Sequence, residues 1–185
     1  LFLSSGIINS PNFTMERICE TLMLLRNEYM FNGYVHVKAI PGALDELLLQ
    51  AGSLADRMSV NIEFPSESSL KKYAPNKSFN LIADPMKKIK DSIEMNRLSI
   101  GKSSKLPRSN INKYLPGSIF NDIAQIEGDN ILKSPLSTKQ ANIRPFVPSG
   151  QSTQMIIGAG DDSDYTILMT AQNLYKSFDL KRVFY

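Results

Sequence analysis

Thiol groups are scarce in this chain, because its 185 residues include a single cysteine, Cys19. One cysteine excludes an internal disulfide and makes a reducing compartment the expected one. Cys19 falls within a helical pattern, so we expect it to be buried in the core rather than reactive. No apolar run is long enough to span a bilayer, and the first residues lack the basic segment of a signal peptide. We therefore expect a cytoplasmic protein without a membrane partner.

Excess charge of one sign is also small, with a net charge of +3. A value this low does not by itself argue for a nucleic-acid partner. The hydrophobic content of 42% and charged content of 21% are close to globular averages, and the length suits one domain. Strand-like patterns run up to both Leu1 and Tyr185. This predicts that the sequence is a piece of a larger protein.

Polar residues occupy one face of three predicted strands, residues 34–38, 58–63 and 152–158. Successive strand side chains point to opposite faces of a sheet, so every second residue shares a face. The polar residues that share a face within each run are His36 and Lys38 in the first, Ser59, Asn61 and Glu63 in the second, and Ser152, Gln154 and Gly158 in the third. A polar face inside a parallel sheet is costly unless something binds there. The pattern therefore indicates a ligand-filled interior.

Helix signals follow these strands. Thr14 is a candidate N-cap, Asp84-Pro85 resembles a helix start with proline in the first turn, and Ser66 and either Asp162 or Ser163 are further caps. Residues 102–142 are rich in Ser, Asn, Lys and Pro, and we expect a long, loop-like insertion there. The alternation of strands and helices predicts an α/β fold with mostly parallel strands. The polar strand faces favour a partial (β/α) barrel over a doubly wound sheet, with residues 1–185 forming part of one domain.

Two stretches of the sequence, residues 33–63 and 148–159, carry a family resemblance, together with residues 1–6 and 181–185. They resemble the radical SAM proteins that are described as putative DNA modification or repair enzymes. The resemblance covers most of the chain outside residues 100–142. It implies a partial barrel that binds S-adenosylmethionine and a [4Fe-4S] cluster, which together generate a 5′-deoxyadenosyl radical. Nucleic acid is then a candidate substrate.

The resemblance also implies roles for individual residues. Ser4, Ser5 and Gly6 occupy the place of a motif that contacts the methionine amino group. Ser59, Asn61 and Glu63 lie on the strand expected to meet the ribose and the methionyl carboxylate. Gln154 and Gly158 lie on the strand expected to pack against the adenine, and His36 and Lys38 are candidates for substrate binding.

The chain departs from the family at one point, because it contains no CxxxCxxC motif for the cluster. In the family this loop precedes the strand that corresponds to residues 1–5, so we expect the cluster ligands upstream of Leu1 and none within the chain. We also expect this piece alone to be inactive and the complete enzyme to be active.

Other interpretations of the same residues stay open. Lys38 would suit a Schiff-base lyase built on a barrel. A purely structural alternative is that Glu63 pairs with Lys38, so that each satisfies the buried charge of the other. A basic run from Lys87 to Arg108 suits a non-enzymatic module that binds nucleic acid. The aspartates at 161, 162 and 164 lack the pattern of a calcium loop and are better explained as helix caps.

Overall fold

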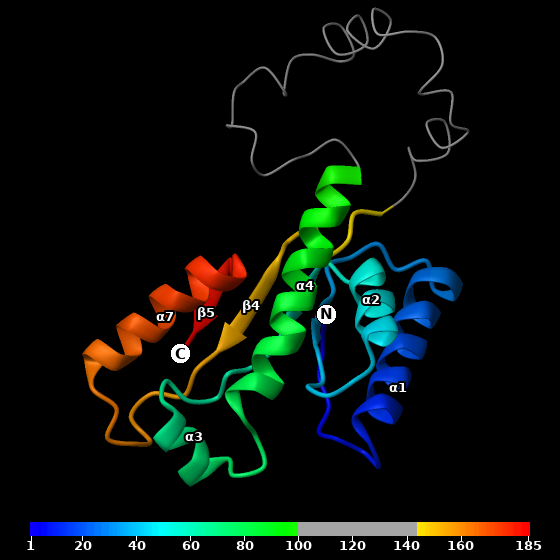
Figure 1. Ribbon diagram of the computed structural model, residues 1–185. Coiled ribbons are helices and arrows are strands. Elements are labelled where there is room, and N and C mark those ends of the chain that lie inside the picture. The colour runs from blue at the N-terminus through cyan, green and yellow to red at the C-terminus, as the bar shows by residue number, and fades with distance from the viewer. Residues whose placement is uncertain (100–143) are drawn as a thin grey trace, which may run out of the picture.

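The computed structural model describes residues 1–99 and 144–185, which form an α/β fold (Figure 1). The strands are β1 (Phe2–Leu3), β2 (His36–Lys38), β3 (Arg57–Ser59), β4 (Gln151–Gln154) and β5 (Arg182–Phe184). The helical elements are α1 (Pro11–Met23), the π-helical segment η1 (Leu24–Glu28), α2 (Asp45–Leu54), α3 (Glu67–Tyr73), α4 (Phe79–Ser99) and α7 (Asp164–Phe178). The predicted alternation of strands and helices is confirmed. The predicted insertion at 102–142 lies outside the described residues.

The five strands form one sheet in the order β1-β2-β3-β4-β5, and every neighbouring pair is parallel. Right-handed crossovers place a helix on the same face of the sheet each time, as long as the strand order does not reverse. Figure 1 shows the resulting layer, in which α1 lies beside α2, α4 follows, and α7 lies beyond α4. A doubly wound sheet would contain a reversal. The opposite face of this sheet therefore receives no crossover helix from the described residues.

The strands are shorter than the sequence predicts, and the reason lies between β3 and β4. The hydroxyl of Thr153 donates to the carbonyl of Val60 at 2.6 Å and accepts from the amide of Ile62 at 3.1 Å. This side chain takes the place of a backbone partner, so the regular ladder stops after Ser59. The two segments meet once more, at a parallel bridge between Glu63 and Met155.

Helix α1 begins earlier than predicted, because Ser10 rather than Thr14 is its N-cap. The Ser10 hydroxyl accepts from the amide of Phe13 at 3.1 Å, and Pro11 occupies the first helical position. Thr14 is instead buried inside the helix, where its hydroxyl accepts from the amide of Ile8 at 2.8 Å.

Helix α4 also begins earlier than the predicted Asp84-Pro85 start. The carbonyl of Ser78 accepts from the amide of Ile82 at 3.2 Å, which sets the first turn. Pro85 consequently lies inside the helix, where it lacks the N–H that would bond to the carbonyl four residues before. Burial of Pro85 and the neighbouring Met86 in the core compensates for this missing hydrogen bond. The predicted cap Ser66 of α3 is confirmed, and of the two candidate caps for α7, Asp162 and Ser163, the structure selects Ser163.

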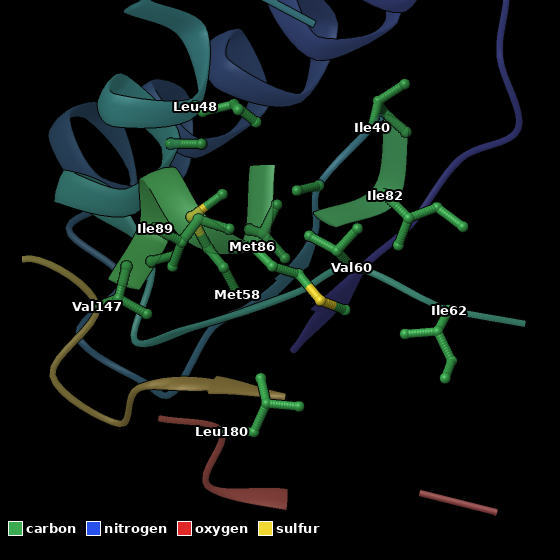
Figure 2. Packing of buried hydrophobic residues seen from close by; sticks show 14 of the residues in the cluster. Ile40, Leu48, Met58, Val60, Ile62, Ile82, Met86, Ile89, Val147 and Leu180 are labelled. Carbon is green, nitrogen blue, oxygen red and sulfur yellow. The ribbon is translucent and has the colours of Figure 1, made fainter. Parts of the chain in front are cut away.

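The core fills the space between the sheet and the helix layer (Figure 2). Met58 and Val60 from the β3 segment point toward Met86 and Ile89 of α4, and all four side chains are at most 1% exposed. Burial of each such side chain stabilises the fold by roughly 1.5–3 kcal/mol. Cys19 belongs to the same cluster, as predicted, and burial raises its thiol pKa to about 11.

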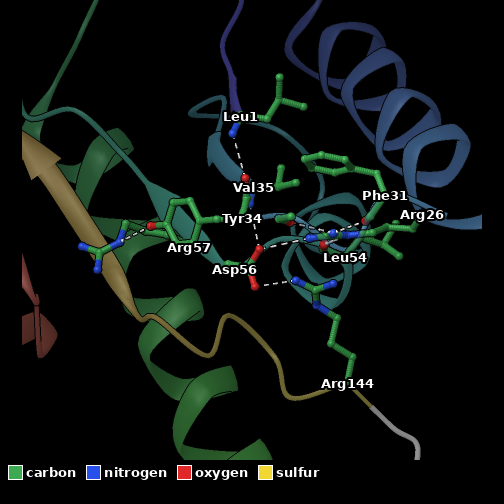
Figure 3. A network of polar contacts seen from close by, with 10 residues as sticks. Leu1, Arg26, Phe31, Tyr34, Val35, Leu54, Asp56, Arg57 and Arg144 are labelled. Carbon is green, nitrogen blue, oxygen red and sulfur yellow. Dashed lines mark hydrogen bonds and ion pairs between the residues drawn. The ribbon is translucent and has the colours of Figure 1, made fainter. Parts of the chain in front are cut away.

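A partly buried ion-pair network fixes the start of β3 (Figure 3). Asp56 accepts from the Arg26 guanidinium at 3.0 Å, the Val35 amide at 2.7 Å and the Arg144 guanidinium at 2.5 Å. Arg26 also donates to the carbonyls of Leu54 at 3.0 Å and Gly33 at 2.9 Å. One carboxylate thus joins η1, the approach to β2 and the segment before β4.

Candidate functional site

The sheet face opposite the helices carries the polar residues that the sequence predicted to share one face. The register pairs His36 with Arg57, Lys38 with Ser59, and Ser59 with Ser152. The first residue of β4, Gln151, points to the helix layer. Its side-chain amide donates to the carbonyls of Met86 at 3.0 Å and Phe178 at 2.6 Å. Ser152 and Gln154 therefore belong to the opposite face. We call this face, without crossover helices, the polar face.

A cavity of about 230 Å³ opens on the polar face. Every strand contributes to it, either directly or through the residues that follow the strand. The cavity is lined by Phe2, Ser4, His36, Lys38, Ser59, Asn61, Thr153, Gln154 and Phe184. It therefore collects six of the predicted site residues, namely Ser4, His36, Lys38, Ser59, Asn61 and Gln154.

Four predicted site residues do not line this cavity: Ser5, Gly6, Glu63 and Gly158. Ser5 donates to the carbonyl of Gly6 at 2.7 Å, which is ordinary turn geometry. Gly158 lies beyond β4 with a φ of 79°, and a Cβ added there would meet no atom within 4 Å. Its glycine is explained by the left-handed backbone, whereas close packing against another group is not seen.

Glu63 turns away from the cavity because its φ is 67°. A left-handed residue breaks the alternation of side chains that the sequence predicted for residues 58–63. The Glu63 carboxylate pairs with Lys77 at 2.6 Å. The interpretation that Glu63 pairs with Lys38 is therefore wrong.

His36 is half-buried against Phe2, with the two ring centroids 4.8 Å apart. Burial, reinforced by the nearby charge of Arg57, lowers the pKa of His36 to about 4. The imidazole is therefore neutral near pH 7. Its Nε2 atom is buried and has no hydrogen-bond partner among the described residues.

A second unpartnered polar atom lies on the polar face. The hydroxyl of Ser152 is fully buried and has no hydrogen-bond partner among residues 1–99 and 144–185. An unsatisfied buried hydroxyl costs about 1–3 kcal/mol. His36 Nε2 and Ser152 Oγ are two of four such atoms among the described residues, the others being Arg144 Nε and Gln151 Oε1. Both belong to the polar face, where a ligand could bond to them.

Several lining residues were not predicted from the sequence. Phe2 and Phe184 read as ordinary strand hydrophobics, but they are 56% and 40% exposed and lie at the two sides of the cavity. Thr153 was missed because the alternation of side chains along the strand assigns it to the face that the helices cover. No sequence signal marks either ring, because their pairing with His36 for Phe2 and with Gln154 for Phe184 follows from the register of the sheet.

The basic run of the sequence is largely engaged within the fold. Lys88 pairs with Asp45 at 2.5 Å, Lys90 donates to the carbonyl of Ser177 at 2.9 Å, and Arg97 lies 3.5 Å from Asp179. Lys102, Lys105 and Arg108 lie outside the described residues. The described part of the run therefore offers few free cations to a phosphate backbone.

Metal and membrane signals are not found in the described ranges. No cluster of three or more His, Cys, Asp or Glu side chains in residues 1–99 and 144–185 could hold a metal ion. Asp162 instead accepts from the hydroxyl of Ser69 at 2.6 Å, next to the N-cap of α7. Over the same residues, no helix combines the length and apolar character needed to cross a membrane.

Comparison of the chain with protein-family models, with curated proteins and with solved structures gave no match.

Proposed function

We propose that this chain is part of a radical SAM enzyme and that the cavity on the polar face binds S-adenosylmethionine. The observation that carries the proposal is the convergence of six predicted site residues on one cavity of a parallel sheet. The unreversed strand order supports it, because a (β/α) barrel uses the same winding. The family resemblance extends the proposal to modification or repair of nucleic acid.

The lining residues suit the cofactor's chemistry. Asn61 and Ser59 offer hydrogen-bonding groups for ribose hydroxyls, and Ser4 offers an acceptor for the methionine ammonium. Gln154 can bond to the edge of an adenine, and the exposed ring of Phe184 offers it a stacking surface. The volume of about 230 Å³ is below the roughly 300–1,000 Å³ of most ligand pockets. The described residues therefore enclose part of the cofactor.

The [4Fe-4S] cluster does not fit the residues of this chain. Such clusters are held by several cysteine thiolates, whereas Cys19 is the single cysteine and is buried in the core. We expect the cluster ligands outside these 185 residues.

His36 and Lys38 are the residues that we assign to substrate binding. Both line the cavity, and His36 is neutral near pH 7, so its Nε2 atom can bond to an uncharged group. Lys38 makes no ion pair with any described residue. Its ammonium is available to an anionic group of a ligand.

The test is calorimetric titration of S-adenosylmethionine into the 185-residue chain and its variants. We expect Asn61→Ala and Gln154→Ala each to weaken binding by about tenfold, since each removes a hydrogen-bonding group from the cavity. The matched controls are Asn173→Ala and Gln172→Ala, which change exposed residues of α7. Equal affinities in all four variants would contradict the assignment of the cavity.

The position of Lys38 favours one second candidate, a Schiff-base lyase. An amine that lines a cavity can form an imine with a carbonyl substrate. Borohydride would reduce that imine to a stable adduct, which mass spectrometry would locate on Lys38. Absence of an adduct with a panel of small aldehydes and ketones would rule this candidate out for those substrates.

A further inference from the structure

Four residues form a continuous row across the polar face. Lys38 of β2 is registered with Ser59 of β3, Ser59 with Ser152 of β4, and Ser152 with Arg182 of β5. Neighbouring strands lie about 4.8 Å apart, so the outer two Cα atoms are separated by roughly 14 Å. The row therefore places two hydroxyls side by side between two cationic side chains.

The central hydroxyls are set for a ligand. Ser152 is fully buried and its Oγ atom has no hydrogen-bond partner among the described residues, while Ser59 is 5% exposed. Two members of the row line the cavity, whereas Ser152 and Arg182 do not. Lys38 and Ser59 line it directly, and the guanidinium of Arg182 lies 5.6 Å from the ring centroid of Phe184, which also lines it.

The charge around the row is of one sign. The strand positions on the polar face include Lys38, Arg57 and Arg182 and no acidic residue. The nearest acidic residues along the chain pair with other cations: Asp56 with Arg26, Glu63 with Lys77 and Asp179 with Lys181. Neither Lys38 nor Arg182 forms an ion pair with a described residue.

We propose that Lys38, Ser59, Ser152 and Arg182 form a binding site for an oxyanion, a phosphate or carboxylate group of a ligand. Cationic side chains supply charge-assisted hydrogen bonds, and the two hydroxyls donate to the same oxygens. The site rests on the proposed function in treating the polar face as the ligand-binding face. It adds to that function a requirement that a ligand bring negative charge to this row.

The experiment uses His36 as a reporter, since it is the single histidine of the chain and gives one imidazole signal by NMR. Inorganic phosphate and, separately, acetate are titrated into the 185-residue chain at constant ionic strength. We expect a saturable shift with at least one of the two anions. An approach of negative charge to this face also raises the pKa of His36, so the signal has a defined direction.

Variants locate the site. We expect Ser152→Ala to weaken anion binding by about tenfold, and Arg182→Gln and Lys38→Gln by at least as much. The matched controls are Ser177→Ala and Lys176→Gln on the exposed side of α7. Ser152→Ala removes an unsatisfied hydroxyl, so its melting temperature should not fall, which separates loss of binding from loss of folding. No saturable shift with either anion, or equal affinity in the row variants and the controls, would overturn the proposal.

A second titration with S-adenosylmethionine separates this proposal from the proposed function. If the cofactor does not bind while phosphate or acetate binds through the row, the oxyanion site stands and the proposed function fails. If the cofactor and the anion compete, the oxyanion is the cofactor's own carboxylate. If they bind together, the oxyanion belongs to a second ligand and Ser59 does not contact the ribose of the cofactor.

Discussion

Replacement of Asp56 by alanine should cost more stability than any exposed ion-pair variant. Asp56 accepts from Arg26, Arg144 and the amide of Val35, and the Arg26 side chain is only 7% exposed. Without the carboxylate, Arg26 keeps the carbonyls of Leu54 and Gly33 but loses its counter-charge. Removing one partner of a buried pair costs about 3–5 kcal/mol, and the 18% exposure of the Asp56 side chain places the expected cost at the low end of that range.

That loss is a large share of the roughly 5–15 kcal/mol that stabilises a typical domain. Urea unfolding followed by circular dichroism measures this loss. The midpoint urea concentration falls in proportion to the free energy of unfolding when the dependence of that free energy on urea is unchanged. Asp56→Asn is the milder variant, because its amide oxygen still accepts from the Val35 amide, while the charge and the acceptor for Arg144 are lost. Its free energy of unfolding should lie between those of the wild type and Asp56→Ala. It also provides a measurable loss of stability if Asp56→Ala does not fold.

Asp45→Ala is the control for this experiment. Asp45 pairs with Lys88 at 2.5 Å, but both side chains are about half exposed, at 52% and 50%. Exposed pairs contribute about 0–1 kcal/mol. If Asp56→Asn and Asp45→Ala cost the same, the network in Figure 3 stabilises the fold no more than an exposed ion pair does.

Two further predictions concern titratable groups. The pKa of His36 is lowered to about 4 from its ordinary 6.5. Between these two pH values, His36 is therefore protonated in the unfolded chain and neutral in the folded chain. The free energy of unfolding should therefore fall as pH decreases from 6.5 to 4 and level off below, by at most about 3 kcal/mol and less where solvent screens the half-buried ring. Subtracting the pH profile of the His36→Gln unfolding free energy from that of the wild type separates the His36 contribution from that of the carboxylates. Identical profiles for the two proteins would refute the prediction. Burial raises the pKa of Cys19 to about 11, so a thiol reagent at pH 8 should label it only in denaturant; rapid labelling of the folded chain would contradict this.

Local sequence patterns predicted the order of the elements and the face of each strand. Alternation along a strand is a local property, so it assigned His36, Lys38, Ser59 and Asn61 to one face. The parallel sheet and the caps Ser66 and Ser163 followed from equally local signals.

Predictions failed where long-range contacts decide the outcome. The ladder between β3 and β4 ends because Thr153 bonds across the strands to residues more than 90 positions away in sequence. Glu63 leaves the polar face because its backbone is left-handed and Lys77 lies within reach. The Asp56 network was not anticipated for the same reason, since its partners come from three separate segments.

Helix starts failed for another reason, because the chain offers competing caps. Ser10-Pro11 and Thr14 are both plausible starts for α1, and the choice depends on the burial of Thr14. Asp84-Pro85 is a strong local start signal, but Ser78 begins α4 a turn and a half earlier. Pattern alone does not rank such alternatives.

Binding of S-adenosylmethionine to the polar face is the central claim, and the His36 imidazole signal tests it most directly. The ring lines the cavity, and no other histidine contributes to the spectrum. Titration of the cofactor into the 185-residue chain should shift this signal saturably, and Asn61→Ala should raise the concentration required. A signal that stays unmoved up to millimolar cofactor would contradict the account.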